Sequence, residues 1–265
     1  MSENVNIHNY SDLIQPIKVL VDNVEQLHNI INVAMRGMSI TQAIPKAVSV
    51  LAKYEGTGNT EKHKKKLEET ERIAGIAKKE IDAGFPFLYT QSAIMLYSYL
   101  EGAIKRLIIT FLKNNNISKI KEVANIKIIF SEFIGLDEGE KYDYIFSQYE
   151  KSITMGIQYG INRFESLLSP IGLNGKVNPS LSKNIFELSQ LRNNILHRGG
   201  TVDKYLKSNC PWLKYELGET IRITNEQYEK YYSSITRYAM VLIIRMGDKT
   251  GREDLEEFRE VDEEE

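Results

Sequence analysis

The sequence predicts an all-α protein, and three observations lead to that fold class. Apolar residues between positions 13 and 34 recur at alternating spacings of four and three, the pattern of one face of a long helix. Residues 87–112 are apolar on nearly every side, which is typical of a helix buried in a bundle. Helical periodicity returns in residues 181–195 and 228–245, so helices are expected to account for most of the chain.

Residues 1–84 form the first expected domain, an N-terminal helical extension. Its apolar stripe predicts a long amphipathic helix that packs within the molecule, although three heptads can also mediate dimerisation. A break at residues 56–59 separates this helix from a charge-rich helix over 61–83. The Lys64–Lys66 run in the second helix is typical of a solvated face, with RNA contact as the alternative. The stripe consists of Leu13, Ile17, Leu20, Val24, Leu27, Ile31 and Ala34.

The second expected domain is a helical bundle over residues 85–250. Its first helix places Glu101 among apolar residues, where a buried carboxylate needs a cationic or hydrogen-bonding partner. Lys105, four residues on, is one candidate partner, and a role beside Arg192 is the other. The pattern over 117–168 is helical but interrupted by glycines, which predicts several helices of moderate length.

Two further elements complete the expected bundle. A loop over residues 169–179 precedes a helix with Ser180 or Ser182 as its N-cap. Alternation around Gly218-Glu219, over residues 213–223, then predicts a small β-hairpin before the last helix. Thr224 and Gln227 have the spacing of a capping box that opens this last helix.

Composition and charge narrow the class of protein. With 42% hydrophobic and 26% charged residues, the 265-residue chain has ample material for a packed core. Residues 251–265 hold nine acidic residues and two arginines, a formal −7, so the remaining body carries +5 within a whole-chain charge of −2. A charge of +5 is smaller than expected for a protein that binds nucleic acid by charge alone, but it is compatible with weak binding to RNA. We expect the acidic tail to be disordered.

No segment of the sequence predicts a membrane, metal or cofactor site. No apolar run approaches the roughly 20 residues of a membrane-spanning helix, and the N-terminus lacks the basic and apolar regions of an export signal. Cys210 is the single cysteine and has no partner for an internal disulfide. The four histidines show no ligand spacing with cysteines or acids. A cytoplasmic protein without a metal or cofactor is therefore expected.

The most informative stretch is Arg192-Asn193-Asn194-Ile195-Leu196-His197-Arg198-Gly199-Gly200, at the end of a predicted helix. Arginine presents a planar donor fork suited to phosphate and histidine exchanges protons near neutral pH, so the pair suits chemistry at a phosphodiester. On a regular helix Arg192 lies about 140° round from His197. Either the helix is distorted near its end, or a second copy completes the site across a dimer axis. The structural alternative is that His197 complements the helix dipole and Arg192 pairs with an acid on a neighbouring helix.

The helix ending LSQLRNNILHRGG resembles the R-x4-6-H motif of the HEPN superfamily (higher eukaryotes and prokaryotes nucleotide-binding). The upstream AIMLYSYLEGAIKRLI resembles the first core helix of prokaryotic HEPN proteins of defence and toxin systems. The resemblance covers roughly residues 85–246 and implies a four- to five-helix bundle that dimerises so that two motifs line one cleft. It implies Arg192 and His197 as the catalytic pair and Asn193 as a supporting polar residue. Gly199 replaces the tyrosine of one family variant, which argues against the nucleotidyltransferase-type antitoxin that accompanies that variant.

The activity that the resemblance implies is metal-independent endoribonuclease cleavage by a toxin or anti-phage defence effector. The ribose 2′-hydroxyl would attack the adjacent phosphate, with His197 moving protons and Arg192 stabilising charge on the phosphorane oxygens. The implied partners are RNA, a second copy of the chain, and an antitoxin or another component of a defence system. The residues expected to bind substrate or to support the catalytic pair are Asn194, Arg198, Glu101 and Lys105.

Two other functions fit the same sequence. The first is a non-catalytic HEPN protein that binds RNA, a nucleotide or a partner protein through the same cleft. The second is a helical interaction module in which the N-terminal stripe and the tyrosine-rich last helix hold subunits together.

Overall fold

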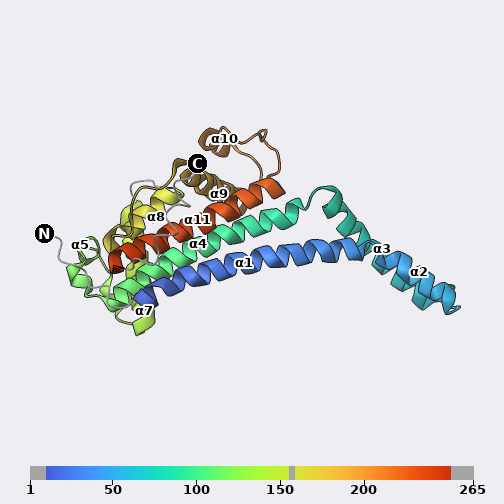
Figure 1. Cartoon of the computed structure of the whole chain (residues 1–265), viewed down its shortest axis with the longest axis horizontal. Helices are drawn as coiled ribbons and strands as arrows, with labels where there is room; N and C mark the ends of the chain where they lie inside the picture. The colour runs from blue at the N-terminus through green and yellow to red at the C-terminus, as the bar shows by residue number, and fades with distance from the viewer. Residues whose placement is uncertain (1–9, 155–158, 252–265) are drawn as a thin grey trace. The chain divides into compact units, whose positions relative to one another are not determined.

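The computed structural model describes residues 10–154 and 159–251, and its regular elements are helices (Figure 1). No strand is present in the part of the chain so described, and the all-α prediction is confirmed. The acidic tail, apart from Gly251, lies outside the described residues. The α-helices are α1 (Tyr10–Thr41), α2 (Ile44–Tyr54), α3 (Glu61–Asp82), α4 (Pro86–Asn114), α5 (Lys121–Ala124), α6 (Phe130–Phe133), α7 (Glu138–Thr154), α8 (Ile161–Leu168), α9 (Pro179–His197), α10 (Lys204–Asn209) and α11 (Asn225–Thr250), and the short 3-10 helices are η1 (Ile117–Lys119) and η2 (Ser169–Ile171).

The chain divides into two compact units, and the division falls within α1, α4 and α11 rather than between helices. The domain boundary predicted after residue 84 lies within unit 2, which includes residues 25–93. Among the described residues, unit 1 comprises 10–24, 94–154, 159–221 and 230–251, and unit 2 comprises 25–93 and 222–229.

The apolar stripe of α1 is buried from Leu13 to Ile31, as its spacing predicts, and Ala34 is half-buried. In unit 2, α3 begins after Thr60, whose hydroxyl accepts a hydrogen bond from the backbone N–H of His63 at 3.2 Å. The Lys64–Lys66 run of this helix is exposed.

Hydrogen bonds and ring contacts between helices hold the core of unit 1. The rings of Tyr97 on α4 and Phe164 on α8 lie 5.8 Å apart. On α11, the Tyr238 hydroxyl donates to Glu165 of α8 at 2.6 Å, and Arg245 Nη1 pairs with the same carboxylate at 2.9 Å. Because these groups are largely buried and mutually satisfied, they fix α4, α8 and α11 relative to one another.

The Glu187 carboxylate on α9 is 1% exposed and binds three donors. The Nε1–H of Trp212 donates to it at 2.6 Å, Lys230 Nζ lies 2.5 Å away, and the Tyr231 hydroxyl also donates to it. Burial, together with the Glu187 charge, raises the pKa of Tyr231 well above its usual range. This carboxylate therefore attaches the segment after α10 to both α9 and α11.

The prediction of a β-hairpin over residues 213–223 is wrong, because residues 219–221 form backbone hydrogen bonds with residues 200–202 instead. Thr220 forms an isolated antiparallel bridge with Thr201. Around it, the Val202 N–H donates to the Glu219 carbonyl at 2.8 Å and the Ile221 N–H donates to the Gly200 carbonyl at 2.9 Å. The segment that leaves α9 therefore takes the backbone hydrogen bonds that a hairpin would have used.

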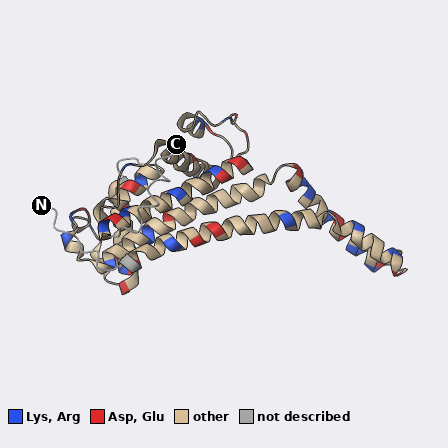
Figure 2. Ribbon diagram, viewed as in Figure 1, with Lys and Arg blue, Asp and Glu red and all other residues tan. Residues whose placement is uncertain are grey.

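Charges of both signs are interspersed over the helices (Figure 2). In the part of the chain that the structure describes, none of the helices has both the length and the apolar character of a membrane-spanning segment.

Candidate functional site

The helix that carries the motif, α9, is regular through its whole length. It begins after Asn178, whose side chain accepts from the Ser180 N–H at 2.8 Å, so the N-cap is this asparagine and not the serine expected from the sequence. It continues without a break to His197. Gly199 and Gly200 then adopt φ angles of +76° and +69°, a conformation that side chains with a Cβ rarely adopt, and they turn the chain sharply away.

Arg192 contacts three groups and is saturated by none of them. Its Nη2 lies 3.4 Å from Glu101 Oε2, longer than the roughly 2.7–2.9 Å of a strong charge-assisted hydrogen bond. Its Nη1 donates to Asn193 Oδ1 at 3.1 Å, and the guanidinium lies 6.0 Å from the centre of the Tyr97 ring. Its buried Nε has no hydrogen-bond partner. The side chain is thus held in place with donor capacity to spare.

Glu101 belongs to a half-buried cluster of acidic and basic side chains. Arg163 of α8 donates from Nη1 to Glu101 at 2.6 Å and from Nη2 to Glu150 of α7 at 2.5 Å. Burial alone would lower the pKa of Arg163, but its hydrogen bonds to the two carboxylates outweigh burial and raise it. Burial and the Glu101 charge raise the pKa of the neighbouring Tyr97 to about 12. The cluster is a rigid support behind Arg192.

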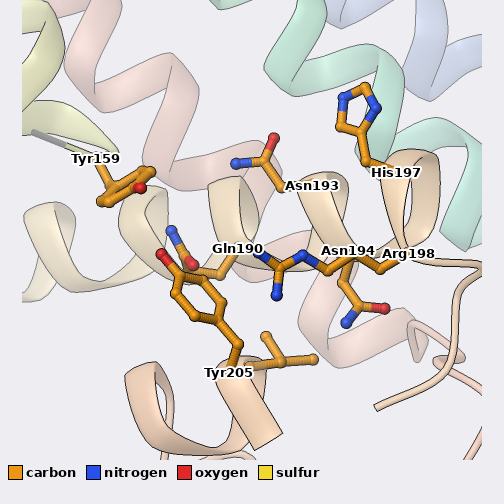
Figure 3. A pocket seen from close by; sticks show the side chains of 8 residues that line it. Tyr159, Gln190, Asn193, Asn194, His197, Arg198 and Tyr205 are labelled. Atoms are coloured by element: carbon orange, nitrogen blue, oxygen red, sulfur yellow. The ribbon is translucent and has the colours of Figure 1, made fainter. Parts of the chain in front are cut away.

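A pocket of about 270 Å³ lies along the last turns of α9 (Figure 3). His197 and Asn193 line it but Arg192 does not. In Figure 3, Asn193 and His197 project to one side of the helix and Asn194 to the other, while the Arg198 guanidinium extends toward Tyr205. The full lining consists of Tyr159, Gln190, Asn193, Asn194, His197, Arg198, Tyr205 and Leu206.

An aromatic and cationic group forms one wall of the pocket. The Arg198 guanidinium lies 4.2 Å from the centre of the Tyr205 ring, a cation–π distance, and its Nη1 pairs with Asp203 Oδ2 at 2.7 Å. A hydrogen bond to Tyr205 raises the pKa of the Tyr159 hydroxyl. The backbone N–H of Leu206 and the Arg198 guanidinium lower the pKa of Asp203. This wall combines flat rings with polar edges.

The inner wall of the pocket holds an unsatisfied carboxamide. Asn194 is 2% exposed, yet neither its Oδ1 nor its Nδ2 has a hydrogen-bond partner. Gln190, one turn earlier, is also buried and makes only long contacts, 3.4 Å from Asn209 Nδ2 and 3.5 Å from Ser189 Oγ. Buried polar groups without partners are rare in folded proteins.

The structure separates the residues singled out from the sequence into two groups. Glu101 lies beside Arg192, as one of its two expected roles requires, and Asn194 and Arg198 lie with His197 around the pocket. Lys105 pairs with Asp143 at 2.6 Å rather than with Glu101, and does not line the pocket. The predicted pairing of Glu101 with Lys105 is therefore wrong.

The positions of Tyr159, Tyr205 and Arg163 near the motif were not predicted from the sequence. Tyr205 comes seven residues after Arg198 in the sequence, but contacts it because the glycine turn reverses the chain. No periodicity marks Tyr159 or Arg163. The Glu101 carboxylate in an apolar helix could have suggested a buried arginine.

Among the described residues, no group of three or more His, Cys, Asp and Glu side chains is arranged to hold a metal ion. Comparison with protein-family models, with curated proteins and with solved structures finds no match to this chain.

Proposed function

We propose that this chain is a metal-independent endoribonuclease of the HEPN type, acting as a toxin or anti-phage effector in the cytoplasm. The observation that carries the proposal is the hydrogen bond from Arg192 to Asn193, because Asn193 also lines the pocket that His197 reaches. This bond connects the guanidinium to the carboxamide of a residue that lines the same pocket as His197. All three residues occupy the motif positions from which the function was expected.

Each residue has a distinct role in the proposed reaction. His197 is exposed at the end of α9. It either accepts the proton of the attacking 2′-hydroxyl as general base or donates a proton to the leaving 5′-oxygen as general acid. Arg192, supported by Glu101, presents its spare N–H groups to the charge that develops on the phosphorane. Asn193 orients the guanidinium. The products are a 2′,3′-cyclic phosphate and a 5′-hydroxyl.

The active cleft is proposed to be completed by a second copy of the chain. Because α9 is regular from Arg192 to His197, helix distortion does not bring the two side chains together. In an isologous dimer, the Arg192 of each copy can lie beside the His197 of the other copy, which completes the cleft. Leu196, beside His197, is 48% exposed and provides apolar surface for such an interface.

The test is cleavage of total RNA and of tRNA by purified protein in EDTA, with analysis of the product ends. Wild type is expected to leave cyclic phosphates, and His197→Ala to lose cleavage by about 10²–10⁴-fold. His63→Ala, on α3 in the other unit, is the matched control and keeps full activity. Equal cleavage by wild type and His197→Ala would contradict the proposal.

The separation of Arg192 from the pocket favours one alternative, a non-catalytic protein that binds RNA, a nucleotide or a partner protein through the same cleft. On that alternative, RNA is retained equally by wild type and by the Arg192→Ala/His197→Ala double variant, and neither protein cuts.

A further inference from the structure

The pocket at the end of α9 contains an unsatisfied group that the proposed reaction does not use. The Asn194 carboxamide has one strong acceptor and one strong donor group, both buried and both without a partner. Leaving such a group unpaired costs about 1–3 kcal/mol. A leucine of similar shape would avoid that cost, so the carboxamide needs a reason to be there.

The walls around Asn194 have the chemistry of a base-binding site. Unstacked RNA bases are held by aromatic rings and by arginine planes, and are read through hydrogen bonds to their edges. Tyr205 and Tyr159 provide the rings, and the Arg198 guanidinium lies over the Tyr205 ring, 4.2 Å from its centre. Asn194 provides the edge-reading group, with Gln190 one helical turn away.

The charges in the pocket favour a base over a phosphate group. Arg198 is paired with Asp203 at 2.7 Å, so its charge is already compensated. The remaining polar lining consists of carboxamides, phenols and His197. The volume of about 270 Å³ lies just below the roughly 300–1,000 Å³ of pockets for drug-sized ligands, which leaves room for one base.

We infer that this pocket holds one unpaired RNA base, hydrogen-bonded at its edge to the Asn194 carboxamide and stacked against the wall formed by Tyr205 and Arg198. The inference rests on the proposed function for its choice of RNA as the ligand. It makes Asn194 a specificity-determining residue beside the cleavage cleft. A carboxamide pairs most favourably with adenine, through the N6 amino group and a ring nitrogen, so adenine is the expected base.

The test is calorimetric titration of wild type, Asn194→Leu and Asn184→Leu with 5′-AMP and 5′-UMP. Asn184, also on α9, is the matched control because its Nδ2 donates to Ser234 Oγ at 3.0 Å and it does not line the pocket. Wild type and Asn184→Leu are expected to bind AMP more tightly than UMP. Asn194→Leu is expected to bind AMP about 5- to 150-fold more weakly, the range that one bidentate base contact supports.

Thermal unfolding of the same proteins gives a second readout. Asn194→Leu removes two unpaired polar groups, so its melting temperature is expected to equal or exceed that of wild type. Asn184→Leu breaks a hydrogen bond and is expected to melt at a lower temperature. If Asn194→Leu fails to fold, Asn194→Ala replaces it in the titration.

The outcomes separate this inference from the ribonuclease proposal, because binding a mononucleotide requires no cleavage. AMP binding that depends on Asn194, in a protein that does not cut RNA, supports the pocket and removes only the proposed reaction. RNA cleavage by a wild type that binds neither nucleotide overturns the base pocket alone. Equal AMP binding by wild type and Asn194→Leu also overturns it, and a lower melting temperature of that variant would then make the carboxamide structural.

Discussion

Arg192 Nη2 lies 3.4 Å from Glu101 Oε2, and this contact joins the motif on α9 to the ionic cluster on α4, α7 and α8. The side chains of both residues are about a quarter exposed, at 22% and 24%. The contact matches the structural alternative for Arg192, an ion pair with a neighbouring helix. Its length also leaves Arg192 free to bind a second anion, since Glu101 is bound more closely by Arg163, at 2.6 Å.

Glu101→Gln keeps the size of the side chain and removes the charge that supports Arg192. We expect kcat for RNA cleavage to fall about 10- to 100-fold with a smaller change in KM, because Glu101 positions Arg192 without touching substrate. The free energy of unfolding should fall by about 1–3 kcal/mol, between the values for exposed and for buried ion pairs. Steady-state kinetics and urea unfolding measure the two effects.

The matched control for that variant is Glu138→Gln. Glu138 pairs with Lys141 at 2.9 Å, but its side chain is 86% exposed. The change is expected to alter stability by less than about 1 kcal/mol and to leave cleavage intact. An equal loss of kcat in both variants would remove the positioning role of Glu101.

Tyr205→Ala removes the ring on which Arg198 lies. We expect RNA binding to weaken about 5- to 150-fold, the range for one base–aromatic stack. Tyr205→Phe keeps the ring and loses only the hydroxyl contact with Tyr159, so its affinity should stay within about threefold of wild type. Fluorescence anisotropy with a short single-stranded RNA measures both, and an equal effect of the two changes would argue against stacking.

Glu187→Gln tests the anchor that holds the segment after α10. Removing the charge leaves Lys230 without its counter-ion, and because Lys230 is 35% exposed the free energy of unfolding should fall by about 1–3 kcal/mol, less than for a fully buried pair. Trp212 is the only tryptophan in the chain and donates to Glu187, so its emission is expected to shift to longer wavelength as its surroundings become wetter. An unchanged emission spectrum and unchanged stability would contradict the anchoring role.

Cys210 should be unreactive in the folded protein. Burial, with the nearby Glu187 charge, raises the pKa of its thiol to about 12, and the thiolate is the reactive form. Because the raised pKa favours the neutral thiol in the folded state, its contribution to stability is complete below pH of about 8.5 and is lost as the pH rises toward 12. Labelling by iodoacetamide at pH 8 is expected to be negligible without denaturant and complete in its presence. Rapid labelling of the folded protein would show that the thiol is accessible.

Apolar periodicity correctly predicted the helices that bury one face, because the spacing of the apolar residues marks that face. The stripe of α1 from Leu13 to Ile31 and the capping box of α11 were both predicted correctly: Thr224 and Gln227 bond each other's backbone N–H groups at 3.0 and 3.2 Å. The hairpin was predicted wrongly because alternation over residues 213–223 cannot show that residues 200–202 compete for the same hydrogen bonds.

The candidate site was only partly predictable for a similar reason. Arg192, Asn193 and His197 lie in one short stretch of sequence, so the motif alone identifies all three as candidate site residues. The Arg163 support and the Tyr205 wall come from other elements, and only the fold places them beside α9. The unsatisfied state of Asn194 is a property of three-dimensional packing and has no counterpart in the sequence.

RNA cleavage by an equimolar, co-refolded mixture of Arg192→Ala and His197→Ala shows whether two copies of the chain build the active cleft together. Each variant alone is expected to be inactive. In the mixture, half of the dimers contain both variants and keep one of the two Arg192–His197 pairs formed between copies, so about a quarter of wild-type activity should return. If wild type cuts RNA while the mixture remains as inactive as its components, Arg192 and His197 do not act together across two copies, and the composite cleft is contradicted.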